Sequence, residues 1–327
     1  MTKRLDRKLA TIRAGAYRPS DFIIADAKDG DMAFGCATPG AAPDGRMKPL
    51  RVYRDDMVKV VESDLVDIML MSVSSAEVLT REGVFAQTDV TPAVRYNDTT
   101  DVWHPRGGAY AASPALPFRT ALLERTKPVT DLGLYAVTFY NDLEQDIHTI
   151  EEYGAFREDA ADAGVRHFLE IFNPGLPVET TTGDFATYNN DMIARILAGV
   201  SRLDRPIFLK AAYNGPAATE EIAAYDPENL VFGVLGGGAG TARDCLELIA
   251  QAERYGARVA LFGRKIYQSE DSVLMVRAMR RVIEEEISSA EGVKAYHADL
   301  AAAGVAPHRP LADDLEITDE ILKANVE

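Results

Sequence analysis

Eight short runs rich in β-branched and other apolar residues alternate along this chain with longer amphipathic stretches, and this alternation limits the fold more than any other feature. Strands that alternate with helices predict right-handed βαβ units and a parallel sheet. The helical stretches between the runs, such as residues 142–164, 189–203 and 241–256, repeat apolar residues every three or four positions. The expected strands are residues 21–26, 66–72, 91–96, 134–140, 167–172, 206–211, 230–236 and 258–263.

Eight such units in 327 residues favour an α/β fold closed into a (β/α)8 TIM barrel. A doubly wound open sheet is the competing fold. Its dinucleotide-binding form has a GxGxxG turn after the first strand, whereas this chain has its glycine cluster, residues 236–240, only after the seventh. We therefore predict the barrel.

Charge and composition exclude several classes of partner. The chain has 35 Lys and Arg against 51 Asp and Glu, a formal net charge of −16, which would repel nucleic acid and anionic membrane surfaces. No apolar run approaches the roughly 18 residues of a membrane span, and the N-terminal residues lack the apolar core of a signal peptide. The only cysteines, Cys36 and Cys245, indicate neither a disulfide framework nor a zinc site. We expect a soluble, cytoplasmic protein.

Two connections are much longer than ordinary βα loops. Residues 27–54 follow the first strand and residues 97–117 follow the third, so in a barrel both would lie at the C-terminal face, where active sites form. Residues after 289 exceed the eight units. We predict a catalytic barrel domain over residues 1–289 and a helical extension over residues 290–327, which could cover a barrel end or contact a second copy in a homo-oligomer.

A lysine stands where an apolar residue would be expected at the end of the sixth strand, in RPIFLKAAYNG. The two-residue period of a strand places Lys210 on the face opposite Leu209. An amine removed from water shifts toward its neutral, nucleophilic form, which is the form that makes a Schiff base. The alternative is a lysine that reaches solvent or pairs with an acid.

Glycines follow the last two expected strands. After the seventh the chain reads LGGGAGTARD, where glycines 236–238 and 240 allow close approach of a ligand and Thr241 begins a helix whose N-terminus favours anions. After the eighth it reads FGRKIYQSED, where Gly263 gives clearance and Arg264 offers a charged fork. In an eight-stranded barrel these two loops form a recurrent phosphate site, although tight turns would also explain the glycines.

Three segments of the chain read, in order, FLKAAYNG, GGGAG and FGRKIYQSED. Together they resemble the class I aldolases of the deoxyribose-phosphate, archaeal fructose-bisphosphate, tagatose-bisphosphate and autoinducer-processing group. The resemblance is clearest over residues 207–282. It implies a TIM barrel in which Lys210 is the Schiff-base lysine and Gly237, Gly238, Gly263 and Arg264 bind the substrate phosphate. It also implies that no metal and no cofactor are needed.

The resemblance assigns two further catalytic roles. Glu170, in HFLEIF, is similar to the glutamate of the tagatose-bisphosphate type and would shuttle a proton, provided that Phe168, Glu170 and Phe172 face the barrel interior; a structural salt bridge is the alternative. Asp26 ends the first strand, as an aspartate of the family does, and would orient substrate hydroxyls or assist breakdown of the carbinolamine. The archaeal branch continues with His-Gly, whereas this chain continues AKDG and places Lys28 nearby.

Other positions depart from the named activities. The deoxyribose-phosphate type has a second lysine on strand seven and the tagatose type has one on strand four, and this chain has neither. We therefore expect a class I aldolase-type lyase that cleaves or forms a carbon-carbon bond in a phosphorylated keto sugar. The alternatives are a sugar-phosphate isomerase or acyl-transfer enzyme on the same barrel, and a non-catalytic sugar-phosphate sensor.

Overall fold

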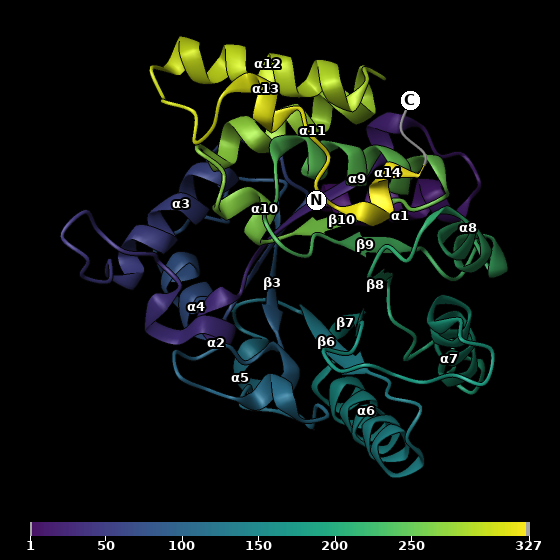
Figure 1. The fold of residues 1–327 in the computed structure, drawn as a ribbon. Helices are drawn as coiled ribbons and strands as arrows, with labels where there is room; N and C mark the ends of the chain where they lie inside the picture. The colour runs from purple at the N-terminus through teal and green to yellow at the C-terminus, as the bar shows by residue number, and fades with distance from the viewer. Residues whose placement is uncertain (1, 325–327) are drawn as a thin grey trace.

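A closed barrel of eight parallel strands forms the centre of the computed structural model, which describes residues 2–324 (Figure 1). The order around the barrel is β1-β10-β9-β8-β7-β6-β3-β2, and pairing of Ile23 with Val259 closes the ring. This confirms the predicted TIM barrel and its eight strands. The barrel strands are β1 (Ile23–Lys28), β2 (Ile68–Met71), β3 (Thr91–Arg95), β6 (Leu132–Thr138), β7 (Arg166–Phe172), β8 (Leu209–Ala211), β9 (Gly233–Leu235) and β10 (Val259–Phe262).

Helices follow the strands and cover the outside of the barrel. Local capping fixes several of them: the Asp142 carboxylate accepts a hydrogen bond from the Gln145 amide at the start of α6, and Gly164 ends that helix with a positive φ of 65°. The helices that follow the barrel strands are α2 (Gly30–Phe34), α3 (Leu50–Glu62), α4 (Val73–Arg81), α5 (Leu123–Thr126), α6 (Leu143–Ala163), α7 (Phe185–Ala198), α8 (Pro216–Tyr225), α9 (Ala242–Arg254), α10 (Arg264–Tyr267) and α11 (Ser272–Glu284).

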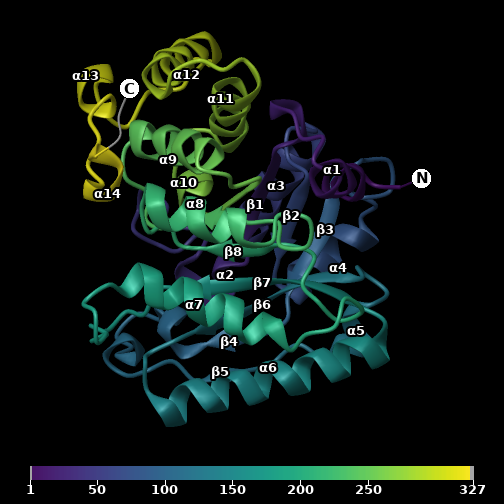
Figure 2. The same ribbon diagram turned by 90° about the vertical axis from the view of Figure 1, so that its right-hand side faces the viewer.

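Alternation along the strands divides the apolar residues into two layers. One cluster lies between strands and helices, and the second fills the barrel interior. The N-terminal helix α1 (Arg4–Arg13) contributes Leu5, Leu9 and Ile12 to the interior cluster, so it closes one end of the barrel (Figure 2). The barrel interior is therefore closed at this N-terminal end, and its C-terminal end is open.

Both long connections contain short elements of their own. The first holds α2 and a bridge between Ala41 and Met47 before α3 begins at Leu50. The second holds β4 (Asp98–Thr99) and β5 (Pro117–Phe118), which pair in a separate antiparallel sheet. The two connections meet, because the His104 amide donates to the Ala33 carbonyl at 2.9 Å and the His104 ring stacks on Phe34 at 5.4 Å.

The helical C-terminal extension predicted from the sequence is present. It comprises α12 (Ser289–Ala303), α13 (Leu311–Asp314) and α14 (Glu320–Lys323), and α12 lies outside α11 and α9 (Figure 1). The Asp314 carboxylate accepts a hydrogen bond from the Ala242 amide at 2.8 Å, so the extension is anchored at the start of α9. Division of the chain into two domains at residue 289 stays a prediction.

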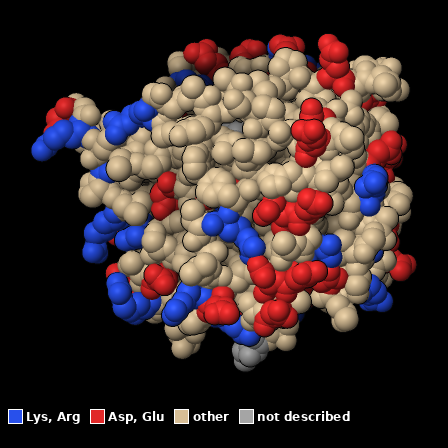
Figure 3. Space-filling model, turned by 90° about the horizontal axis from the view of Figure 1, so that it is seen from below, with Lys and Arg blue, Asp and Glu red and all other residues tan. Residues whose placement is uncertain are grey.

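Charged side chains of both signs are interspersed on the face of the molecule shown in Figure 3. Among the described residues, no helix has the length and apolar character needed to cross a membrane. Cys36 is exposed and Cys245 is buried, and both are free thiols.

Candidate active site

A cavity of about 220 Å³ opens at the C-terminal ends of the barrel strands. Its walls come from both long connections and from the ends of β3, β7, β8, β9 and β10. This is the end of the barrel at which TIM-barrel enzymes place their chemistry. The residues with charged or titratable side chains that line it are Asp29, Tyr53, Arg95, Asp98, His104, Glu170, Lys210, Arg264 and Tyr267.

Lys210 and Glu170 form an ion pair at the floor of this cavity. They are direct partners in the register of β7 and β8, so neighbouring backbones set their approach. Lys210 is 6% exposed and Glu170 is 1% exposed. The faces predicted from the sequence are correct: Phe168 and Phe208 belong to the interior cluster, whereas Leu169 and Leu209 face the helices.

Stacked aromatic rings lie beneath the ion pair. Phe168 and Phe208 precede Glu170 and Lys210 by two residues, and their ring centroids are 4.6 Å apart. Both rings are buried, so bulk water has no access to the pair from below. The low-dielectric floor strengthens charge interactions among the groups above it.

Arg95 connects this pair to the first long connection. Its Nη1 lies 2.9 Å from Asp29 Oδ2 and 3.6 Å from Glu170 Oε2, and its Nε lies 3.7 Å from Asp98 Oδ1. The charges therefore alternate from Asp29 through Arg95 and Glu170 to Lys210. The third guanidinium nitrogen of Arg95, Nη2, is buried without a hydrogen-bond partner in the described structure.

Burial and neighbouring charges shift two pKa values here. Burial lowers the pKa of Arg95, but the carboxylates of Asp29 and Glu170 outweigh burial and raise it above its ordinary value. Burial raises the pKa of Asp98 to about 6, although Arg95 opposes the shift. Asp98 therefore changes charge within the range in which enzymes are assayed.

The sequence assigned no role to Asp29, Arg95 or Asp98. A usable signal was present, since each of the three lies at or just after the end of a barrel strand, where side chains converge on the C-terminal face. Their mutual pairing could not be read from spacing, because 66 residues separate Asp29 from Arg95.

The glycine loops after β9 and β10 form the opposite wall. Gly237 has a positive φ of 65°, which a side chain would strain, and a Cβ on Gly263 would lie 2.8 Å from the Ala27 carbonyl oxygen. Gly237, Gly263 and Arg264 line the cavity, whereas Gly238 does not. Burial lowers the pKa of Arg264.

The start of α9 differs from the expectation that it would be open to a ligand anion. The amide of Thr241 donates to Asp244 Oδ2 at 3.0 Å, and that of Ala242 donates to Asp314 of the extension at 2.8 Å. Carboxylates of this chain therefore occupy these two donors. The phosphate site predicted at these loops is thereby reduced to the backbone around Gly237 and Gly263 and to Arg264, and it stays a prediction.

Asp26 lies outside the cavity. It shares its strand face with Ile24 and Lys28, toward the helices, and Lys28 Nζ lies 3.1 Å from Asp26 and 2.9 Å from Asp56. Burial raises the pKa of Asp26 to about 7, although Lys28 opposes the shift. Its predicted contact with substrate hydroxyls is thus not supported by its position, because Ala27 takes the inward-facing place at this end of β1.

In the described part of the chain, no group of three or more His, Cys, Asp or Glu side chains has an arrangement that could hold a metal ion. The functional groups that converge on the cavity include the Lys210 amine, the guanidinium groups of Arg95 and Arg264, carboxylates and backbone amides.

Solved structures with this fold include Schiff-base aldolases. An archaeal fructose 1,6-bisphosphate aldolase is 16% identical, with a TM-score of 0.60 over 85% of this chain and 98% of its own. A second archaeal structure, whose catalytic lysine is covalently bound to the carbinolamine intermediate of the substrate, is also 16% identical, with a TM-score of 0.60 over 85% and 99%. A fructose-bisphosphate aldolase from Slackia heliotrinireducens is 12% identical, with a TM-score of 0.62 over 90% of both chains.

No protein-family model matches the sequence, and no curated protein matches it either. The comparisons therefore establish the fold, a TIM barrel that these fructose-bisphosphate aldolases share.

Proposed function

We propose that this protein is a class I aldolase-type lyase that cleaves or forms a carbon-carbon bond in a phosphorylated keto sugar through an imine on Lys210. The observation that carries the proposal is the position of the Lys210 amine, buried in the cavity beside Glu170 and facing the loops of Gly237 and Gly263. The fold shared with aldolases whose lysine forms a carbinolamine supports the same chemistry.

Imine formation begins with transfer of a proton from the Lys210 ammonium, for which Glu170 is the adjacent acceptor. The neutral amine attacks the substrate carbonyl and gives a carbinolamine, whose hydroxyl leaves as water after protonation by Glu170. The product is a protonated imine on Lys210.

Cleavage uses the imine as an electron sink. A carboxylate at Glu170 takes the proton of the hydroxyl on the carbon beyond the scissile bond, that hydroxyl becomes a carbonyl, and the bonding pair moves to form an enamine. Proton return to the enamine carbon and hydrolysis release the second product and restore the amine, so no external oxidant or reductant is required.

The charges around the cavity favour a substrate with one phosphate. Gly237, Gly263 and Arg264 offer one anion site, whereas the wall at the ends of β1 and β3 carries Asp29 and Asp98. The cation on that wall, Arg95, already has three carboxylates within 4.0 Å. A second phosphate there would meet like charges, whereas sugar hydroxyls could donate hydrogen bonds to the two aspartates.

Borohydride trapping tests the imine. Protein incubated with ketose monophosphates and reduced should gain the mass of the substrate less one oxygen atom on the peptide that contains Lys210, because imine formation loses water and reduction adds two hydrogens. Lys210→Met should abolish the adduct. Lys48 is exposed in the first long connection, so Lys48→Met is the matched control and should keep the adduct. If the sugar phosphate binds but no adduct forms on Lys210, the lyase hypothesis is rejected in favour of a non-catalytic sugar-phosphate sensor.

Product analysis separates the remaining alternatives. A lyase releases two shorter carbonyl compounds, whereas an isomerase or acyl-transfer enzyme that uses the same imine leaves the carbon chain uncut or moves an acyl group. Comparison of ketose monophosphates with the matching bisphosphates should give the higher kcat/KM for the monophosphates. Preference for bisphosphates would contradict the charge argument while leaving the imine mechanism intact.

A further inference from the structure

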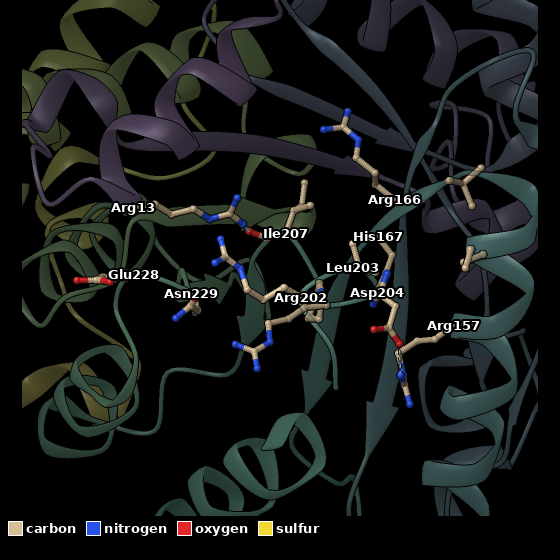
Figure 4. Close-up of a pocket in the computed structure, with 15 residues that line it drawn as sticks. Arg13, Arg157, Arg166, His167, Arg202, Leu203, Asp204, Ile207, Glu228 and Asn229 are labelled. Atoms are coloured by element: carbon tan, nitrogen blue, oxygen red, sulfur yellow. Dashed lines mark hydrogen bonds and ion pairs between the residues drawn. The ribbon is translucent and has the colours of Figure 1, made fainter. Parts of the chain in front are cut away.

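A second cavity, of about 290 Å³, lies at the opposite end of the barrel (Figure 4). It is bounded by the end of α1, the last turns of α6 and the chain segments that enter β7, β8 and β9. These are the N-terminal ends of the strands, so this cavity is separate from the candidate active site.

Five arginines line this cavity, and three of them are held by carboxylates. Arg157 pairs with Asp204, Arg166 lies 2.7 Å from Asp6 and 3.0 Å from Asp131, and Arg205 lies 3.5 Å from Asp226. His167 is buried against Tyr153, and burial lowers its pKa to about 3, so it adds no positive charge near neutral pH.

The other two arginines, Arg13 and Arg202, form no ion pair within residues 2–324. Arg13 donates a hydrogen bond from Nη2 to the Ile207 carbonyl at 2.6 Å, which holds its side chain at the cavity wall and leaves its other donors free of protein carboxylates. Arg202 is exposed at the cavity mouth. Burial lowers the pKa of Arg13 and the positive charge of Arg202 lowers it further, although the Asp6 carboxylate, which is paired with Arg166, opposes the shift. The two guanidinium groups therefore repel each other.

Unpaired guanidinium groups are unexpected in a chain with a net charge of −16 and 51 acidic residues. The cavity wall has two acidic side chains, Asp204 and Glu228. Asp204 is paired with Arg157, and Glu228 forms no ion pair in the described structure, so neither neutralises Arg13 or Arg202. A planar guanidinium binds phosphate or carboxylate oxygens with two parallel hydrogen bonds, and an anion between Arg13 and Arg202 would relieve their repulsion.

We propose that this arginine-lined cavity binds a small oxyanion, a phosphate ester or a carboxylate, between Arg13 and Arg202. The Asn229 amide, on the same wall, adds a neutral hydrogen-bonding group for the rest of the ligand. The site does not depend on the proposed chemistry at Lys210, because it shares no residue with the active-site cavity.

Calorimetric titration in an Arg264→Ala background tests this site, because that background weakens anion binding in the active-site cavity. We expect one remaining site for inorganic phosphate or for malonate, and the preference between these two probes identifies which oxyanion the cavity takes. Arg202→Glu, added to the background, should weaken this binding at least about tenfold. Arg202 is exposed and makes no ion pair in the described chain, so we expect its replacement to leave the fold intact.

Arg46→Glu in the same background is the matched control. It makes the same change in charge at an exposed arginine of the first long connection, and it should leave the remaining site unchanged. Equal loss of affinity in both variants would mean that net charge alone governs binding, and would overturn the site. Absence of binding of both probes in the Arg264→Ala background, or binding that Arg202→Glu does not change, would also overturn it.

Discussion

The two members of the Glu170–Lys210 pair should differ in how much their replacement destabilises the fold. Lys210 forms one ion pair among the described residues, to Glu170. Glu170 has a second cation, Arg95, at 3.6 Å, and Arg95 has Asp29 at 2.9 Å. Lys210→Met therefore leaves Glu170 with a counter-ion, whereas Glu170→Gln leaves a 6% exposed ammonium with none.

An uncompensated buried charge costs about 3–5 kcal/mol, and loss of a proton from Lys210 would recover part of it, so we expect Glu170→Gln to lower the free energy of unfolding by about 2–4 kcal/mol. Lys210→Met should cost about 1 kcal/mol or less, because an apolar chain replaces the amine while Arg95 still neutralises Glu170. The double variant should resemble Lys210→Met. Urea denaturation of the four proteins at pH 7 measures these differences. Greater destabilisation by Lys210→Met than by Glu170→Gln would refute the compensation by Arg95.

The same variants separate structural from chemical roles. Glu170→Gln keeps the shape of the side chain and removes the base, so cleavage should slow by roughly a hundred- to ten-thousand-fold while an imine on Lys210 can still be trapped. A near-normal rate in this variant would leave Glu170 with only the structural role of a counter-ion.

Further predictions concern other charged groups. Arg264→Ala should raise KM for a phosphorylated substrate by roughly ten- to a hundred-fold, because a charge-assisted contact is lost, and an unchanged KM in steady-state kinetics would remove Arg264 from the phosphate site. Asp98 has a pKa of about 6, so kcat/KM should rise with pH through that value as the carboxylate becomes able to accept substrate hydrogen bonds, and Asp98→Asn should remove this limb of the profile. Burial raises the pKa of Asp26 to about 7, so the folded state holds a proton that the unfolded chain releases above about pH 4. The free energy of unfolding should therefore fall as pH rises from about 4 to 7. Asp26→Asn should flatten this pH dependence in denaturation curves. Chelators should leave the activity unchanged, and a strict requirement for a divalent metal would contradict the imine mechanism.

The sequence alone predicted the barrel and the inward-facing positions of Lys210 and Glu170. Both follow from local periodicity: strand runs separated by helical stretches imply βαβ units, and a two-residue alternation assigns each strand residue to one face. The place of Gly237, Gly263 and Arg264 on the cavity wall was predictable because the loops after the last two strands of a barrel are adjacent by topology, whereas their contact with a phosphate stays a prediction.

Only the tertiary structure decided which groups meet across long stretches of chain. Asp29 and Arg95 belong to different strand ends, and Asp314 reaches the start of α9 across 72 residues of sequence. Asp26 was assigned by analogy to the cavity, yet the pleat of β1 turns it toward the helices, where Lys28 and Asp56 neutralise each other beside it. The unpaired Arg13 and Arg202 at the opposite end of the barrel could not be predicted from the sequence either. Whether a charged side chain meets a partner depends on how distant segments pack, and the sequence pattern does not specify that packing.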